Sequence, residues 1–410
     1  MHLPEEVLHA IVLALHDSDV AIVSQVNTTF NRIAQQRLYH DLNLKLDHPA
    51  QLYNLLRTLT SQPWRASLVH SVKLSCWDPF DHVAQVGPGS PLTPKETFIL
   101  IETTKTLPLT PALAENVRHG LQSGVIDAGL AMLIYICDQI NSLEIIAHYF
   151  IGNSLFMSLL AETGSTVSKS PNRSVAGSSD FGQHYQMLSQ VQVTHADAGD
   201  LQQLAPLIFL PSLQVFNGLT CNLSDGKHLS SNLKSNLRSL NLEESLVDAD
   251  GMSDLLKVCP GLVSLSIGYG SAYVGYCELS WTAVGNVLRN YGSRLESLTL
   301  DTSTSDILFH TDSEGILGSL SALTSLQKLH LPVNALVPQS LHNNQHLEDM
   351  MPGSLRCLHV QSKEDSIDKE GLDVQLRQLM GSLKCRRLTY VKRTHERVWK
   401  SKSIALELHK

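Results

Sequence analysis

The hexapeptide Leu295-Glu296-Ser297-Leu298-Thr299-Leu300 shows the pattern from which the architecture of this chain is inferred. Conservative versions of this Leu-x-x-Leu-x-Leu pattern recur through the second half of the 410 residues. Their last positions are Val215, Leu242, Ile267, Leu300, Leu331 and Val360, so successive units lie 27, 25, 33, 31 and 29 residues apart. Alternation of apolar residues predicts one strand in each unit, with its leucines on one face.

Helical patterns lie between these units, as at Gly251–Val258, Trp281–Asn290 and Leu317–Leu323. One strand and one helix at this period predict a leucine-rich-repeat solenoid, in which each unit covers the apolar edge of its neighbour. The segment from Val247 to Leu262 resembles the cysteine-containing subclass of these repeats. Earlier units are expected around Leu74 and Ile145 and a late one around Leu388. The uneven steps predict an irregular solenoid, and a generic α/β domain with Leu-rich strands is the alternative.

Outside the repeats, the first 46 residues carry a different, helical periodicity. Leu3, Val7, Leu8, Ile11 and Leu15 lie on one side of a helix that begins near Pro4. Asp17-Ser18-Asp19 is expected to cap a second helix, and a third places Phe30, Ile33 and Leu38 on one stripe. Three short helices are too small to bury all of these side chains. We therefore expect a covering surface, either a partner protein or the rest of this chain.

The segment resembles the F-box family in Leu3-Pro4-Glu5-Glu6-Val7-Leu8, in Val23-Ser24-Gln25-Val26 and in the aromatic Phe30, where many members have Trp. The resemblance implies a three-helix module that docks on a Skp-type adaptor and, through it, on a cullin-RING ligase. The residues that it implies for adaptor binding are Leu3, Pro4, Val7, Leu8, Ile11, Leu15, Val23 and Val26. The fold class that we predict is thus α/β, a short N-terminal three-helix F-box followed by an irregular leucine-rich-repeat-like solenoid.

Composition shifts predict five segments. They are an F-box at 1–46, a helical and first repeat-like region at 47–160, a flexible Ser/Thr/Gly-rich insertion at 161–182, a leucine-rich-repeat-like domain at 183–391 and a basic tail at 392–410. The basic stretch Lys384 to Lys402 is typical of a solvated terminal helix; a partner with an acidic face or a nuclear import signal are alternatives.

Composition also excludes several classes of protein. With 43% apolar and 17% charged residues the chain is globular, and its net charge of −8 disfavours a nucleic-acid binder. No apolar run approaches the ~20 residues of a membrane span. Seven scattered cysteines indicate reduced thiols, and so the cytoplasm or nucleus, with no metal site and no cofactor.

No motif indicates catalysis. Gly268-Tyr269-Gly270 lacks the third glycine of a dinucleotide fingerprint, and His342 and His346 have no third metal ligand nearby. We expect no catalytic residue and no enzyme activity. An enzyme would need a cluster of titratable side chains that the sequence does not show.

The expected function is that of a substrate-recognition adaptor of an SCF-type ubiquitin ligase, and the alternative is a protein-binding scaffold outside ubiquitylation. The client, a protein, is expected on the outward positions between the inward leucines. These are Ser239, Asn241, Ser264, Ser266, Ser297, Thr299, Lys328, His330, Cys357 and His359, with Ser264, Ser266, Thr299, Lys328, His330 and His359 as the central set. The change from small polar to potentially cationic residues suggests an extended acidic or phosphorylated client segment.

Overall fold

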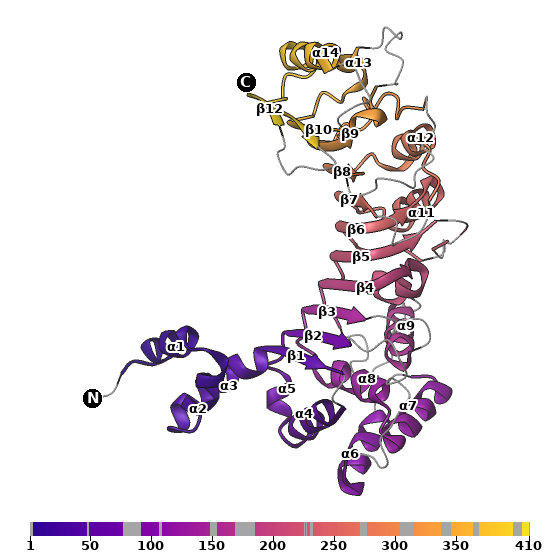
Figure 1. Ribbon diagram of the computed structural model, residues 1–410. Helices are drawn as coiled ribbons and strands as arrows, with labels where there is room; N and C mark the ends of the chain where they lie inside the picture. Colours follow the sequence, from indigo (N-terminus) through magenta and orange to yellow (C-terminus); the bar gives the residue numbers. More distant parts are fainter. Residues whose placement is uncertain are drawn as a thin grey trace, which may run out of the picture. The chain divides into compact units, whose positions relative to one another are not determined.

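A computed structural model describes residues 3–46, 49–76, 92–105, 109–147, 154–168, 185–224, 226, 228–229, 233–270, 277–303, 315–337, 346–363, 369–396 and 404–409. The chain forms two compact units (Figure 1). The first contains residues 1–193 and 210–213, and the second contains residues 194–209 and 214–410. The α/β fold class predicted from the sequence is confirmed, with twelve strands and fourteen α-helices among the described residues.

The first unit starts with three short helices, α1 (Glu5–Ala14), α2 (Asp17–Val23) and α3 (Thr28–His40). Val12, Val20, Ile33 and Ala34 form their buried centre. Asn27 caps α3 by accepting the backbone N–H of Phe30 at 2.9 Å. The predicted cap of α2 is wrong: the helix starts at Asp17 itself, and His16 precedes it without a side-chain cap hydrogen bond.

The strand β1 (Asp41–Lys45) begins at the residue after α3 ends. The rest of the first unit is made of α4 (Pro49–Ser61), α5 (Pro63–Ala66), β2 (Ser71–Cys76), α6 (Pro94–Thr104), α7 (Pro111–Ser123), α8 (Ile126–Ile136), β3 (Ser142–Ala147) and α9 (Leu155–Ser168). The strands β1, β2 and β3 pair in parallel, so the two early repeat units expected from the sequence do form strands. Residues 169–184, most of the predicted flexible insertion, lie outside the described residues.

β4 (Gln190–Asp200) contains the boundary between the units. The second unit continues with η1 (Leu201–Leu204), α10 (Ala205–Ile208), β5 (Val215–Leu223), β6 (Ser239–Val247), α11 (Ala249–Val258), β7 (Ser264–Tyr269), α12 (Trp281–Tyr291), β8 (Ser297–Asp301), β9 (Lys328–Pro332), η2 (Val333–Ala335), α13 (Leu347–Met350), β10 (Cys357–Lys363), α14 (Lys369–Gly381), β11 (Tyr390–Glu396) and β12 (Ile404–His409). β5 to β11 pair in parallel and in chain order, with α11 and α12 on one side of the sheet (Figure 1).

The inward leucines of the repeats are aligned across the strands of the second unit. The same register position holds Phe216, Leu240, Leu265, Leu298, Leu329, Leu358 and Val391 from β5 to β11. Each of these side chains is buried. Burial of one such side chain stabilises a fold by about 1.5–3 kcal/mol, so this row is a main source of stability in the unit.

Two glycines let helices approach neighbouring repeats closely. A Cβ on Gly251 of α11 would lie 2.0 Å from the carbonyl oxygen of Leu223, and one on Gly285 of α12 would lie 1.9 Å from that of Leu317. Side chains at these positions are therefore excluded by backbone and not by a neighbour that can rotate away.

Two predicted helices are absent from the described residues. Residues 317–323 form an irregular segment, in which Leu317, Leu320 and Leu323 are buried and Gly318 has a left-handed φ of 71°. The segment is held by backbone hydrogen bonds from Leu317 to Ala335 and from Leu320 to Met350. In the basic stretch, β11 forms where a terminal helix was expected, because its backbone pairs with β10 and β12. No helix in the described part of the chain is long and apolar enough to cross a bilayer.

Candidate functional site: two protein-binding surfaces

Exposed aliphatic side chains gather on the three N-terminal helices. Val7 and Ile11 are four residues apart, so they share one side of α1, and the exposed Leu3 lies just before the helix. Val12 is buried in the centre of the module. Ile22 and Val26 are 66% and 63% exposed at the end of α2 and just after it. We call these five residues, Leu3, Val7, Ile11, Ile22 and Val26, the docking face.

The eight residues predicted to bind an adaptor divide into two groups. Leu3, Pro4, Val7, Ile11 and Val26 are exposed. Leu8, Leu15 and Val23 are only partly exposed, because they pack against the buried centre of the module. The role of all eight in binding stays a prediction. Sequence reasoning missed Ile22, since its neighbours Val20 and Val23 carry the helical spacing.

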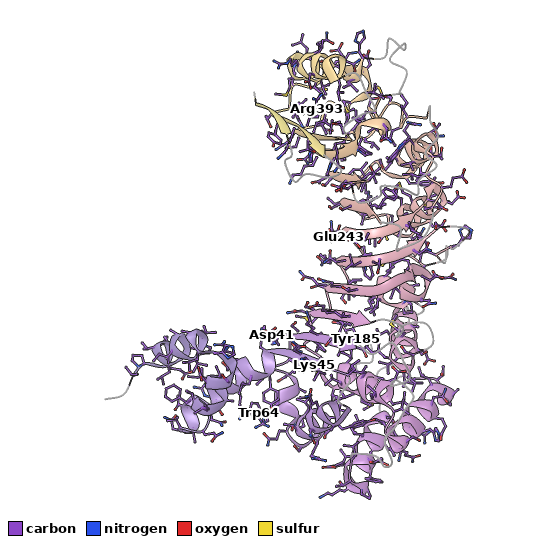
Figure 2. The ribbon with its side chains drawn as sticks, in the orientation of Figure 1. Asp41, Lys45, Trp64, Tyr185, Glu243 and Arg393 are labelled. Atoms are coloured by element: carbon purple, nitrogen blue, oxygen red, sulfur yellow. The ribbon has the colours of Figure 1, made fainter. Side chains whose placement is uncertain are left out.

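The three-helix module is held against the first repeat by Arg65 of α5. Its guanidinium donates to Oε1 of Gln35 at 3.2 Å and to the hydroxyl of Tyr39 at 3.1 Å, and lies over the Tyr39 ring. Figure 2 labels the neighbouring exposed Trp64 on α5, and Asp41 and Lys45 at the two ends of β1. At the start of β1 the rings of His40 and His70 stack with centroids 4.8 Å apart. The docking helices therefore continue directly into the repeat fold.

A second candidate surface lies on the strands of the second unit. The residues one position after the inward leucines occupy matching register positions on seven strands. From β5 to β11 they are Asn217, Asn241, Ser266, Thr299, His330, His359 and Lys392, and all are partly exposed. We call this row the strand face. The structure thus places the predicted residues Ser266, Thr299, His330 and His359 next to one another.

The other predicted client-binding residues form the adjoining row. Ser239, Ser264, Ser297, Lys328 and Cys357 share one register position, two residues before the strand face, from β6 to β10. Lys328 is exposed and its ammonium contacts no carboxylate among the described residues. Whether this row or the strand face touches a client stays a prediction.

The histidines of the strand face form a pair. The rings of His330 and His359 stack with centroids 4.0 Å apart, and Nε2 of His359 is 3.0 Å from the hydroxyl of Thr394 on β11. Burial lowers the pKa of His330, and burial together with the neighbouring His330 and Lys392 lowers the pKa of His359 to about 4. Both rings are therefore neutral at pH 7. The two histidines are thus not cations at that pH, contrary to the potential charge noted in the sequence analysis.

A distortion at β6, which the sequence did not reveal, brings carboxylates to this side of the sheet. The pairing of β6 with β7 shifts between Leu242 and Ser245, and Glu244 adopts a left-handed φ of 45°. Glu243 and Glu244 are both exposed beside this bulge, and Asn241 donates to Oε1 of Glu243 at 2.9 Å. Figure 2 labels Glu243 on β6.

The described residues contain no group of three or more His, Cys, Asp or Glu side chains that could hold a metal ion. Of the two histidines considered as metal ligands in the sequence analysis, His342 and His346, the first lies outside the described residues. Burial raises the pKa of the Cys137, Cys221 and Cys259 thiols to about 12, so all three are protonated and unreactive at neutral pH.

Comparison with known families matches both parts of the chain. The family model described as a leucine-rich repeat domain matches residues 49–388, and a model described as F-box-like matches residues 1–45. A comparison with curated proteins finds no match. The two matches meet between the end of β1 at Lys45 and the start of α4 at Pro49.

Proposed function

Because the chain belongs to the leucine-rich repeat family and carries an F-box-like domain at its N-terminus, we propose that it is the substrate-recognition adaptor of an SCF-type ubiquitin ligase. Both domains are protein-interaction modules, and neither typically carries a catalytic site. In this role the chain binds a Skp-type adaptor through the docking face and a client protein through the strands of the second unit. The receptor then raises the local concentration of client near the ubiquitin-transfer enzymes.

The exposed docking face is the observation that carries this proposal. Five aliphatic side chains stand on a module whose buried centre consists of only four residues. Val7 and Ile11 are 41% and 39% exposed, so a partner that covered them would gain about 1 kcal/mol from each, a useful part of a micromolar affinity. Six of the cysteines, at positions 137, 221, 259, 277, 357 and 385, form no disulfide, which is consistent with a proposed location in the cytoplasm or nucleus.

Co-purification of the full chain with a Skp-type adaptor and a cullin tests the proposal. We expect the wild-type chain to recover both, and the Val7→Asp/Ile11→Asp variant to lose both, because buried carboxylates would lack partners. A Leu3→Ala/Pro4→Ala double variant gives a milder version of the same loss.

Leu13→Asp is the matched control. Leu13 is as exposed as the docking face but lies on another side of α1 by helical spacing. The Leu13→Asp variant should still bind the adaptor. Loss of binding in Val7→Asp/Ile11→Asp alone would then reflect a lost contact and not a misfolded module. Equal recovery of the adaptor by wild type and Val7→Asp/Ile11→Asp would refute the docking role.

A protein-binding scaffold outside ubiquitylation is the second candidate function. It rests on the same docking face, which can hold an adaptor without a ligase. Recovery of the adaptor without any cullin, in the same pulldown, would favour this scaffold over the ligase receptor.

A further inference from the structure

Three exposed arginines lie where the chain enters the last two parallel strands of the second unit. Arg356 immediately precedes β10, and Arg386 and Arg387 lie in the segment before β11. The carbonyl oxygen of Arg356 accepts the backbone N–H groups of Thr389 and Tyr390 at 2.9 and 3.2 Å, so the two entry segments lie side by side. We call Arg356, Arg386 and Arg387 the cationic patch.

The residues beside the patch leave it with an excess of positive charge. Among the described residues, none of its three guanidinium groups forms an ion pair. The adjacent Lys384 is paired with Asp349, and Glu348 lies near the same lysine. One repeat earlier, the position of Arg356 is taken by the neutral Gln327, whose amide donates to Glu296 at 3.4 Å. Three arginines therefore face the single charge of Glu348, in a chain with a net charge of −8.

The other charged residues of β11 and β12 lie further along these strands. Glu407 is opposite Lys392 in register, two positions into β11 and thus about 7 Å from its start. Glu396 ends β11, about 20 Å from its start. Arg393, which Figure 2 labels, is buried and pairs with Asp373. The charge of the patch is therefore that of the entry segments and not that of the strands.

An exposed leucine extends the same surface. Leu383 is 77% exposed, more than any other large apolar residue in the described part of the chain. A Cβ on Gly353 would lie 3.1 Å from the carbonyl oxygen of Lys384, so the segment that carries Leu383 lies beside the segment that carries Arg356. Residues 383–387 span at most about 14 Å, and neighbouring strands lie about 4.8 Å apart. An extended segment of about four or five residues would cover this surface.

Resting on the proposed receptor role for the identity of the partner, we infer that the cationic patch and Leu383 bind a short acidic segment of the client protein. The segment carries about three carboxylates and one apolar side chain, because guanidinium groups bind carboxylates through paired, charge-assisted hydrogen bonds. A nucleic acid fits this surface less well. Its long polyanion needs an extended basic surface, whereas the net charge of this chain is −8.

The test measures fluorescence anisotropy of labelled octapeptides with the full chain. One peptide is rich in Asp and Glu around a central leucine, the second has Asn and Gln in place of the acids, and a single-stranded DNA octamer is the third probe. At about 50 mM salt we expect the acidic peptide to bind at least tenfold more tightly than the neutral peptide and more tightly than the DNA. Binding should weaken at about 0.5 M salt, because exposed charges are screened.

Charge reversal of the patch tests which residues bind. The Arg356→Glu/Arg386→Glu/Arg387→Glu variant should bind the acidic peptide at least tenfold more weakly. Because all three residues are exposed, its thermal unfolding should match that of wild type. Leu383→Ser should weaken the acidic peptide about threefold, as expected for the loss of a partly covered aliphatic contact. It should not weaken an acidic peptide that has glycine in place of its leucine.

A matched control separates the patch from the net charge of the chain. Lys45→Glu/Lys95→Glu/Arg238→Glu changes the net charge by the same amount at three exposed residues outside the patch. This variant should bind the acidic peptide as tightly as wild type does, within about twofold.

Equal binding of the acidic and neutral peptides would overturn the inference, as would equal losses in the patch variant and its control. DNA that binds more tightly than the acidic peptide would instead assign the patch to a nucleic acid. Recovery of the Skp-type adaptor is measured on the same preparations. If the adaptor is recovered and the acidic peptide does not bind, only the client inference fails. If wild type does not recover the adaptor, the receptor role fails, whatever the peptides show.

Discussion

His330 and His359 stack across β9 and β10 with their ring planes inclined by 20°, on the strand face of the second unit. Their charge environment comes from the strands on either side: Asp301 on β8 favours the protonated rings, and Lys392 on β11 opposes protonation. Burial opposes it more strongly in both rings. The pair is therefore a neutral part of the surface at physiological pH.

This pair predicts a pH dependence of stability. An unfolded histidine takes up its proton near pH 6.5, whereas the pKa of folded His359 is about 4. Between these values the unfolded state binds more protons, so the contribution to stability is complete above about pH 6.5 and is lost as the pH falls towards 4. We expect His359→Gln to lose less stability than wild type between pH 7 and pH 5. Thermal unfolding at a series of pH values measures this, and parallel curves would contradict it.

The close approach of α12 to Leu317 predicts that Gly285 cannot be replaced by a larger residue without a loss of stability. Gly285→Ala would force its Cβ against a carbonyl oxygen at 1.9 Å and should destabilise the second unit by about 1–3 kcal/mol, the usual cost of overpacking. Gly381→Ala at the end of α14 is the control, because nothing lies within 4 Å of its Cβ. That substitution should be neutral or stabilising. Chemical denaturation of both variants decides between these outcomes.

Asp127 of α8 acts as a buried cap for the start of α9. Its carboxylate accepts the backbone N–H groups of Leu155 and Phe156, and burial raises its pKa despite these two bonds. Asp127→Ala leaves both donors without this acceptor and should cost about 1–3 kcal/mol. Asp127→Asn, which retains one acceptor oxygen, should cost less. Unfolding midpoints of both variants equal to that of wild type would show that the carboxylate does not stabilise the start of α9.

The hydrogen bonds of Arg65 are expected to stabilise the contact between the three-helix module and the first repeat. Arg65→Ala removes the bonds to Gln35 and Tyr39 and should cost about 1–2 kcal/mol. Amide hydrogen exchange should rise in α3 and less elsewhere. Arg118→Ala removes contacts within α7, an ion pair with Glu115 and a hydrogen bond to the carbonyl of Ala114, and should leave exchange in α3 unchanged.

The repeats could be predicted from the sequence because their information is local. Leu265, Leu298 and Leu329 each alternate with polar residues, and alternation alone fixes which side faces inward. The F-box-like helices could also be predicted from the sequence, since the four-residue spacing of Leu3, Val7 and Ile11 indicates one side of a helix.

What the sequence did not reveal depends on partners that are distant in the chain. Leu317, Leu320 and Leu323 have helical spacing, but their segment follows hydrogen bonds to Ala335 and Met350. Arg393 seemed part of a solvated basic stretch. It lies opposite buried Val360 and is itself buried, because its guanidinium pairs with Asp373 of α14 at 2.6 Å.

The candidate site was predictable to the same extent. The outward positions of β7 to β10 followed from alternation, and the structure brings Ser266, Thr299, His330 and His359 into one row. The bulge that presents Glu243 and Glu244 arises from the pairing of β6 with its neighbours, for which no local signal exists. The neutral state of the histidines likewise depends on burial, which composition does not reveal.

The last strand of the second unit runs against the direction of β5 to β11. β12 pairs with β11 in antiparallel fashion from Tyr390 opposite His409 to His395 opposite Ile404. An unpaired border of a parallel sheet is a template on which another polypeptide can add a strand. Here that border of β11 is occupied by β12 of the protein's own chain. Stacking of a second molecule onto β11 is therefore blocked, and lengthening the array by inserting repeats would first have to displace β12.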